Sequence, residues 1–260
     1  MPGTDSDLAL LVAAAHAAGE IAATHFRNRP RVWEKSDGQG PVTQADLEVD
    51  AMLRARLMAA RPDYGWLSEE SADDHARLAR KRVFIIDPID GTRAFIDGQT
   101  GFSHVLCIVE DGAPVAAVIH LPLLQYTYTA QRGQGAFLNG QRVQVSQHGG
   151  TGRADILVAR PQLAAKLWPG GVPDCTRHFR PSLAWRLALV AEAQFDAMLT
   201  LRPTWHWDIA AGALMVSEAG GVVSDGHGAQ LRFNLAEPRA DGIIAAGPAL
   251  HAALLARRTA

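Results

Sequence analysis

Two aspartates three residues apart follow a short apolar run in the segment VFIIDPIDGTRAF, residues 83–95. Asp87 and Asp90 leave the end of a predicted buried strand, where a charge is costly unless something pairs with it. Two carboxylates at one turn also repel each other unless a cation lies between them. A hard divalent ion such as Mg²⁺ prefers oxygen ligands and would accept both. The purely structural alternative is that a carboxylate accepts loop N–H groups or pairs with Arg93.

Other acidic residues could complete such a metal site. Glu69 and Glu70 follow a short apolar run in WLSEES, although these two alone would equally indicate a solvated loop. Asp208 in WHWDIAAG begins a predicted helix and could simply be its N-cap. Asp46 lies in the first turn of another predicted helix, where an acid favours the helix dipole. Each of these acids therefore has a structural explanation when it is considered alone.

Gly91 and Thr92 add a second chemical element directly after the aspartates. Glycine permits close approach of the backbone to a ligand, and free N–H groups there can hold phosphate oxygens. Carboxylates for Mg²⁺ beside a phosphate cradle are the parts of a metal-assisted phosphoryl hydrolase. No Ser-His-Asp or Cys-His nucleophile arrangement is evident. The motifs therefore predict hydrolysis of a phosphate ester by a metal-activated water.

The elements that would position these residues form an α+β pattern. In residues 1–146, two helices (6–27, and 44–61 with Thr43 as N-cap) precede a strand at 83–86 that Pro88 would end. Asp111-Gly112 and Asn139-Gly140 predict hairpins of an antiparallel sheet. Residues 147–260 alternate strands and helices, which predicts a second, α/β domain that supplies Asp208 and substrate contacts. The boundary is expected within residues 147–171.

Composition excludes several classes of function. The chain has 260 residues and a net charge of −2, so it has no basic excess to track a nucleic-acid polymer. The N-terminus lacks the layout of a signal peptide, and no apolar run reaches the roughly 18 residues that would indicate a membrane span. Cys107 and Cys175 are the only cysteines. So few cysteines fit a reducing compartment, although a single disulfide between them is still possible. We expect a cytoplasmic protein that binds a small phosphate ester.

The motifs together resemble the inositol monophosphatase family of Mg²⁺-dependent phosphatases. The matching segments are VTQAD (42–46), SEES (68–71), DPIDGT (87–92), WDIAAG (207–212) and EAGG (218–221). They occur in the order of the family and spread over nearly the whole chain. The resemblance implies a layered α-β-α-β-α sandwich of the inositol monophosphatase and fructose-1,6-bisphosphatase type. It also suggests inhibition by Li⁺ and, by analogy, a homodimer.

The resemblance assigns a role to each matching residue. The catalytic residues would be Asp46, Glu69 and Thr92, and the metal ligands would be Glu69, Glu70, Asp87, the Ile89 carbonyl, Asp90 and Asp208. Two Mg²⁺ ions are implied, with a third, weaker site at Glu69 and Glu70. Thr92, oriented by Asp46, would help to activate the water that attacks phosphorus in line. The phosphate and substrate contacts would be Gly91, Thr92, Ser182, Arg186 and Arg202.

Departures from the family pattern concern the substrate. Inositol-specific members commonly carry an acid several residues before the Trp-Asp pair, whereas this chain has Arg202 there. An arginine favours a second phosphate. RPTWHWD and SLAWRLALVAEAQFDAML also resemble the 3'(2'),5'-bisphosphate nucleotidase branch, although that branch often has a lysine after Ser-Leu; Arg186 could replace it. Ser68 stands where the family usually has glycine.

These departures favour a 3'(2'),5'-bisphosphate nucleotidase that converts 3'-phosphoadenosine 5'-phosphate to AMP. An inositol-1-monophosphatase or a histidinol-phosphate phosphatase on the same scaffold is the alternative. A haloacid-dehalogenase-type phosphatase also has aspartates after a strand, but they are two residues apart rather than three. A non-catalytic metal- or nucleotide-binding regulator with the same fold is a further alternative, because a fold alone does not determine function.

Overall fold

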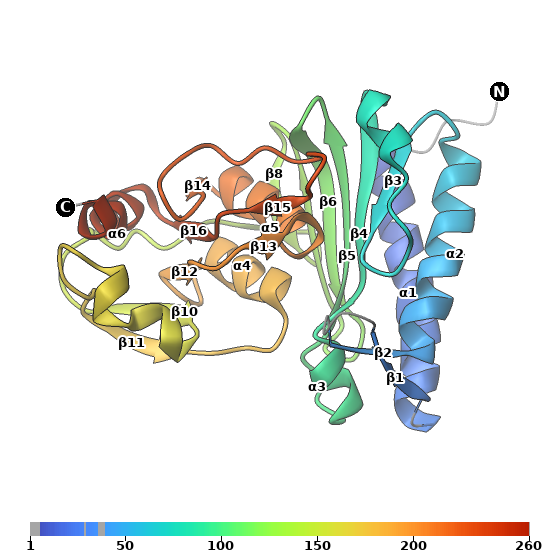
Figure 1. Ribbon diagram of the computed structural model, residues 1–260, viewed down its shortest axis with the longest axis horizontal. Coiled ribbons are helices and arrows are strands. Elements are labelled where there is room, and N and C mark those ends of the chain that lie inside the picture. The colour runs from blue at the N-terminus through green and yellow to red at the C-terminus, as the bar shows by residue number, and fades with distance from the viewer. Residues whose placement is uncertain (1–5, 29, 36–39, 260) are drawn as a thin grey trace.

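The computed structural model describes residues 6–28, 30–35 and 40–259, whose helices and sheets stack in five layers (Figure 1). Helices α1 and α2 form one outer layer, and α6 forms the opposite one. Between them lie a seven-stranded sheet, the helix pair α4 and α5, and a five-stranded sheet. This arrangement confirms the predicted α-β-α-β-α sandwich.

The described helices are α1 (Asp7–Asn28), α2 (Gln44–Ala60), α3 (Thr92–Ile96), α4 (Leu183–Ala191), α5 (His206–Glu218) and α6 (Pro248–Thr259), with short 3-10 helices η2 (His75–Ala79), η3 (Arg160–Leu163) and η4 (Ala165–Leu167). The strands of the larger sheet are β3 (Gly65–Ser68), β4 (Arg82–Asp90), β5 (Ser103–Glu110), β6 (Ala113–Leu121), β7 (Tyr126–Gln131), β8 (Gly135–Leu138) and β9 (Gln141–Val143). The smaller sheet contains β10 (Ala154–Val158), β11 (Cys175–His178), β12 (Ala197–Thr200), β14 (Val222–Ser224) and β16 (Ile243–Ala246). Two short ladders pair β1 (Val32–Glu34) with β2 (Pro41–Thr43), and β13 (Thr204–Trp205) with β15 (Arg239–Ala240).

The larger sheet runs in the order β3-β4-β5-β6-β7-β8-β9, and all its pairs except β3–β4 are antiparallel. Both predicted hairpins are confirmed, since Glu110 pairs with Ala113 and Leu138 with Gln141. The residues of both turns have positive φ, between 48° and 83°, as a type I′ turn requires.

Strand β4 supplies buried residues to both faces of this sheet. Phe84 and Ile86 pack with α1 and α2, whereas Val83 and Ile85 pack with α4 and α5. This alternation follows from the two-residue period of a strand. The predicted end of the strand at Pro88 was wrong, because β4 continues to Asp90 through an irregularity in its pairing with β5. Proline is tolerated at such bulges.

Helix α1 is long and apolar enough to cross a membrane by length and composition alone. Its buried residues, among them Leu11, Ala14 and Ala18, belong to the core between α2 and the sheet. A core helix of this kind passes the same test, so the feature is weak evidence for a span. The absence of a membrane segment remains a prediction.

Helix α5 lies between the two sheets and packs closely against α4. A Cβ atom at Gly212, the last residue of the WDIAAG segment, would collide with Leu187 of α4. The smaller sheet runs in the order β11-β10-β12-β16-β14 and packs its other face against α6. The core between the sheets contains residues from both halves of the chain. The division at residue 146 remains a prediction.

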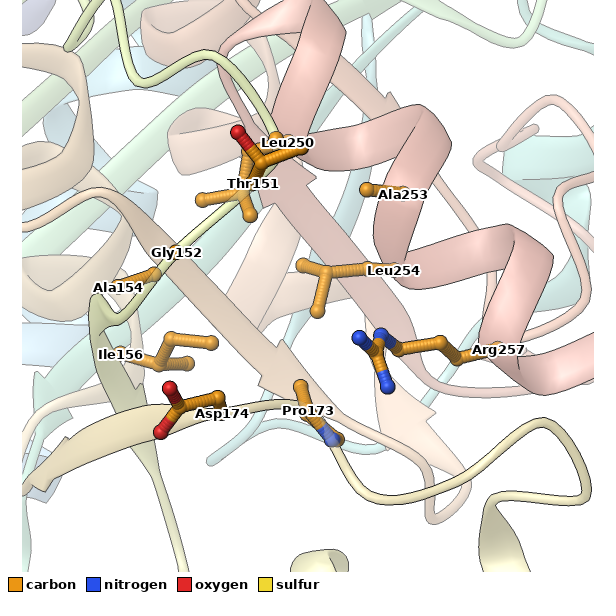
Figure 2. A pocket seen from close by; sticks show the side chains of 11 residues that line it. Thr151, Gly152, Ala154, Ile156, Pro173, Asp174, Leu250, Ala253, Leu254 and Arg257 are labelled. Carbon is orange, nitrogen blue, oxygen red and sulfur yellow. The ribbon is translucent and has the colours of Figure 1, made fainter.

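A cavity of about 310 Å³ lies between α6 and the start of β10 (Figure 2). Apolar side chains such as Ile156 and Leu254 line it, and the charged groups of Asp174 and Arg257 also face it. None of the residues predicted to do chemistry lines this cavity. The predicted site residues gather at the end of β4 instead.

Candidate active site

The irregularity in β4 places Asp87 and Asp90 on the same side of the sheet. Residues three apart on a regular strand point to opposite faces. Here the pairing with β5 shifts between Asp87, opposite Val105, and Asp90, opposite Ser103. One extra residue in β4 therefore places both carboxylates on the side of the sheet that faces α4 and α5.

Three carboxylates from distant parts of the chain meet on that side. Glu69 directly follows β3, Asp87 lies on β4, and Asp208 lies in the first turn of α5. One oxygen from each lies within 4.8 Å of the others. The structure thus brings together residues that are more than 130 positions apart in sequence, as the predicted metal site requires. Asp90 and Glu70 lie outside this closest group, although both raise the pKa of Asp87.

The group has the properties of a cation site. Burial, followed by the neighbouring carboxylates, raises the pKa of Asp87 and that of Asp208 well above the usual range. Asp87 Oδ1 is also buried without a hydrogen-bond partner among the described residues. A bound cation would satisfy this oxygen and offset the repulsion between the carboxylates. The residues present therefore fit a hard divalent metal ion.

The start of α4 holds Asp90 in place. Asp90 Oδ2 accepts hydrogen bonds from Ser182 Oγ at 2.6 Å and from the Ala184 N–H at 2.7 Å. Ser182 also caps α4, because its Oγ accepts from the Trp185 N–H at 2.9 Å, and its hydroxyl lies 3.0 Å from that of Ser103. Ser182 is fully buried and contacts Asp90 directly, so its predicted contact with substrate remains a prediction.

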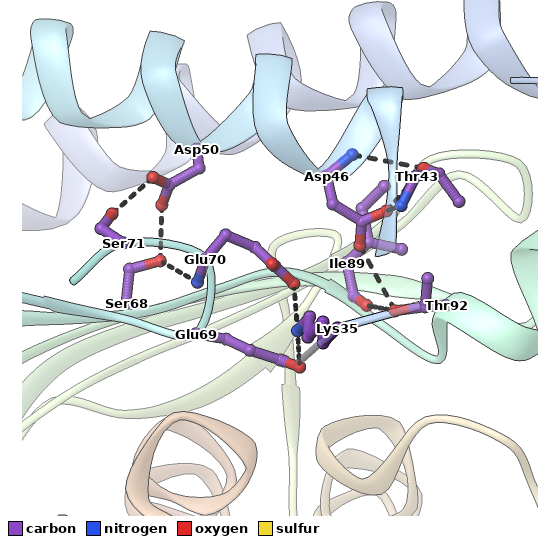
Figure 3. Close-up of polar contacts among 10 residues, drawn as sticks. All are labelled: Lys35, Thr43, Asp46, Asp50, Ser68, Glu69, Glu70, Ser71, Ile89 and Thr92. Carbon is purple, nitrogen blue, oxygen red and sulfur yellow. Dashed lines mark hydrogen bonds and ion pairs between the residues drawn. The ribbon is translucent and has the colours of Figure 1, made fainter. Parts of the chain in front are cut away.

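Asp46 contacts both Thr43 at the start of α2 and Thr92 after β4 (Figure 3). Its Oδ2 accepts from the N–H and the hydroxyl of Thr43, at 2.8 and 2.5 Å, and so completes a capping box at the start of α2. Its Oδ1 accepts from Thr92 Oγ1 at 3.3 Å. Burial raises the pKa of Asp46 to about 6, although the bonds from Thr43 oppose the shift.

Gly91 and Thr92 form the turn from β4 into α3. Gly91 has a φ of 100°, a left-handed conformation that favours glycine, and it is the N-cap of α3. The Thr92 hydroxyl lies 3.1 Å from the Ile89 carbonyl as well as near Asp46. The predicted binding of phosphate oxygens by the N–H groups of this turn, and of a metal by the Ile89 carbonyl, stays a prediction.

Lys35 is the residue that sequence reasoning missed most clearly (Figure 3). Its Nζ donates to Glu69 Oε1 and Glu70 Oε1, both at 2.6 Å. Burial alone would lower the pKa of Lys35, but the two carboxylates raise it above its usual value. Nothing in the local sequence marks a lysine 34 positions before Glu69 as its partner.

A second missed residue, Asp50, anchors the loop that carries both glutamates (Figure 3). Its two carboxylate oxygens accept from Ser68 Oγ and Ser71 Oγ, each at 2.5 Å. Asp50 lies one helical turn after Asp46 on α2, so a shared face could have been inferred from this spacing. The contact also gives a reason for serine rather than glycine at position 68.

The two predicted arginines lie differently. Arg186 is buried, its Nε donates to the Arg180 carbonyl, and its guanidinium stacks on the Phe179 ring at 4.1 Å. Burial lowers the pKa of Arg186 to about 10. Arg202 is exposed, and its charge lowers the pKa of Asp208 against the stronger effects of burial and Asp90. Arg202 is therefore close enough to act on the acidic group.

The raised pKa values predict how the metal-free protein responds to pH. Burial, followed by Glu69, raises the pKa of Glu70 to about 7, and that of Asp46 is about 6, whereas unfolded carboxyls titrate near ~4. Between these values the folded state binds more protons, so the free energy of unfolding falls as the pH rises. A loss of only about 1 kcal/mol lowers the melting temperature by roughly 2–4 °C in a chain of this size.

We therefore expect the melting temperature in chelator to fall between about pH 5 and about pH 7.5, as measured by calorimetry. Asp87→Asn removes one carboxylate from the group and should reduce this fall. A melting temperature that rises over the same range would contradict the assigned ionisation.

Comparison with known proteins places this geometry in a family. A model of the inositol monophosphatase family matches residues 4–260. The chain belongs to this family. An inositol-1-monophosphatase of Rhizobium meliloti (strain 1021) is 34% identical over 232 residues, covering 85% of this chain and 86% of that protein.

Two further proteins show the range of the similarity. The 3'(2'),5'-bisphosphate nucleotidase CysQ of Aggregatibacter actinomycetemcomitans is 32% identical over 233 residues, covering 86% of each chain. The crystal structure of the extragenic suppressor protein suhB from Bartonella henselae superposes with a TM-score of 0.81 at 29% identity, covering 96% of this chain and 97% of that one.

Family membership confirms the predicted enzyme class. The chain is a metal-dependent phosphate monoester hydrolase that acts on a small molecule. The dehalogenase-type alternative does not fit this family and its layered fold. The similarity to an inositol-1-monophosphatase and to a bisphosphate nucleotidase favours an enzyme over the non-catalytic alternative.

Proposed function

We propose that the protein is a Mg²⁺-dependent phosphatase of 3'(2'),5'-bisphosphate nucleotides. The observation that carries the metal dependence is the convergence of Glu69, Asp87 and Asp208, with a buried and unpartnered oxygen on Asp87. Asp90, the Ile89 carbonyl and Glu70 would complete two Mg²⁺ sites and a third, weaker one. Bound Mg²⁺ would polarise the phosphate and lower the pKa of a water molecule.

Thr92 and Asp46 would orient that water. Because Thr92 donates its hydroxyl proton toward Asp46, its oxygen lone pairs are free to accept a hydrogen bond from water. With a pKa of about 6, Asp46 can take up a proton through Thr92 near neutral pH. The N–H groups of Gly91 and Thr92 would hold the phosphate oxygens, and Glu69 would support the same water.

The preference for a bisphosphate rests on Arg202. Arg202 is exposed and its charge acts on Asp208, which supports a position near the acidic group from which the guanidinium would bind a second anion. Arg186 is held by backbone carbonyls and would contribute positive charge rather than a direct contact. The same proposal includes inhibition by Li⁺, a homodimeric state and a cytoplasmic location. It also expects the protein to bind neither nucleic-acid polymers nor membranes.

Substrate choice gives the test of this preference. A hydrogen bond from guanidinium to phosphate contributes about 1.5–3 kcal/mol, or roughly 10- to 150-fold at ~1.4 kcal/mol per decade. We expect kcat/KM to be higher by this factor for 3'-phosphoadenosine 5'-phosphate than for inositol 1-phosphate. Arg202→Glu should reduce the ratio, mainly through the KM of the bisphosphate.

Arg257→Glu is the matched control, because it changes the same charge at an exposed position on α6. It should leave the ratio of the two substrates unchanged. A wild-type preference for inositol 1-phosphate, or an Arg202→Glu variant with an unaltered ratio, would disprove the nucleotidase assignment and leave the metal-dependent phosphatase intact.

Hydrolysis of inositol 1-phosphate is the second candidate, favoured by the similarity to the Rhizobium meliloti enzyme. Histidinol phosphate is a further candidate substrate for an enzyme of this fold. A phosphate-release screen over these esters and sugar bisphosphates would rank them. If no ester in the panel released phosphate, the non-catalytic alternative would gain support.

A further inference from the structure

The bulge that brings Asp87 and Asp90 to one face leaves backbone groups outside the regular strand ladder. Pro88 and Ile89 lie between the last regular pair, Asp87 with Val105, and the next pair at Asp90. Both residues are buried, and a buried carbonyl without a partner is costly. The Ile89 carbonyl lies 3.1 Å from the Thr92 hydroxyl. The Pro88 carbonyl needs another donor.

His104 supplies that donor. It lies on β5 directly opposite the bulge, between the residues that pair with the two aspartates. Its Nδ1 is 2.5 Å from the Pro88 carbonyl oxygen. Because a carbonyl can only accept, Nδ1 must carry the proton, which determines the tautomer. The side chain thus gives the Pro88 carbonyl a buried hydrogen-bond donor next to the bulge.

The surroundings of His104 keep this bond intact over the working pH range. The residue has no exposed surface, and burial lowers its pKa to about 3. The Phe102 and His120 rings lie next to it, with centroids 6.1 and 6.2 Å away. The imidazole is therefore neutral near pH 7 and can donate from Nδ1.

We propose that His104 is a positioning residue for metal binding, which fixes the Pro88–Ile89 peptide so that Asp87 and Asp90 point at the cation. The inference rests on the metal site of the proposed function. His104 reaches the chemistry only through the backbone of the bulge. Rotation of this peptide would turn the neighbouring carboxylates and the Ile89 carbonyl away from a shared centre.

His120 provides a matched control. It is the cross-strand neighbour of His104 on β6, and it is also largely buried. Its Nδ1 lies 3.0 Å from Thr127 Oγ1 and 3.2 Å from the Tyr126 carbonyl, not near the bulge. Replacing His120 with phenylalanine therefore perturbs the same core without removing the donor to Pro88.

The test measures the affinity of the chelator-treated, full-length protein for Mg²⁺ by titration calorimetry, together with its melting temperature without metal. Partners that orient ligands typically contribute about 10- to 100-fold to metal affinity. We expect His104→Phe to weaken Mg²⁺ binding by this factor. His104→Asn, whose amide can donate from nearly the same position as Nδ1, should recover most of the affinity. His120→Phe should leave it within about twofold, even where the melting temperature falls equally.

Equal Mg²⁺ affinity for His104→Phe and His120→Phe would overturn the role of His104 and leave the metal site standing. If His104→Phe does not fold, His104→Asn still decides: near wild-type affinity supports the role, and a loss of tenfold or more in a folded protein contradicts it. Absence of Mg²⁺ binding by the wild-type protein would instead refute the proposed metal site.

Discussion

Asp87→Asn is expected to lower kcat/KM by at least about 10³-fold while the protein stays folded. The metal ion is worth several kcal/mol to the reaction, and each 1.36 kcal/mol is a factor of ten. Asp87 lies at the centre of the acidic group, with an oxygen that has no other partner among the described residues. Its replacement therefore removes one ligand of the proposed cation site. Steady-state release of phosphate, with Mg²⁺ in excess, measures the loss.

Stability separates this effect from unfolding. Repulsion from Glu69, Asp90 and Asp208 adds to burial in raising the pKa of Asp87, so Asp87→Asn should not lower the melting temperature in chelator. Asp97→Asn, at an exposed position just after α3, is the control and should retain full activity. An active Asp87→Asn enzyme would show that this carboxylate holds no catalytic metal.

Thr92→Ala is expected to lower kcat by about 10²–10⁴-fold, the usual contribution of a positioned proton-transfer group. The Thr92 hydroxyl lies 3.3 Å from Asp46 Oδ1 and 3.1 Å from the Ile89 carbonyl. Its loss should leave Mg²⁺ binding nearly unchanged, which distinguishes it from Asp87→Asn. Thr92→Ser keeps the hydroxyl and should recover most of the rate.

Asp46→Asn tests whether the two residues act as one unit. If Asp46 works through the Thr92 hydroxyl, the double variant should be little worse than Thr92→Ala alone. Because Asp46 also caps α2, some loss of stability is expected from its replacement, and kcat must be compared at temperatures where both proteins are folded. If the fold-losses of kcat in the two single variants multiply in the double variant, Asp46 does not act through Thr92 and serves only as part of the helix cap.

Elements of the fold could be predicted wherever a short sequence pattern, such as a turn dipeptide or a helix cap, is compatible with one local structure. Turns such as Asn139-Gly140 specify hairpins through their positive φ angles, and both predicted hairpins exist. The Thr43 cap was found because capping depends on residues within one turn. The segments of the family occur in order, so the layered arrangement followed from the resemblance.

The bulge in β4 could not be predicted by the same means. Proline usually ends a strand, and the sequence around Pro88 contains no donor for its carbonyl. The donor is His104, sixteen positions later on the next strand. Two aspartates three apart reach one face only because of this irregularity. Their spacing predicted a metal site, but it did not predict the bulge that turns both side chains to the same side of the sheet.

Polar contacts between residues far apart in the sequence could not be predicted either. Lys35 bonds to Glu69 and Glu70 across more than thirty positions, and Ser182 bonds to Asp90 across 92. Such contacts depend on how layers stack, not on local pattern. Asp46 shows a different limit: one of its oxygens completes the cap of α2 and the other lies 3.3 Å from Thr92, so the structural interpretation does not exclude the functional one.

The location of a bound metal tests the central claim most directly. Crystals grown with Mn²⁺ in place of Mg²⁺ should show an anomalous difference peak between Glu69, Asp87 and Asp208, with carboxylate oxygens about 2.0–2.6 Å away. A second peak near Asp90 would support two ions. Mn²⁺ found only elsewhere on the protein, with these carboxylates left unliganded, would contradict the assignment of this group as the catalytic metal site.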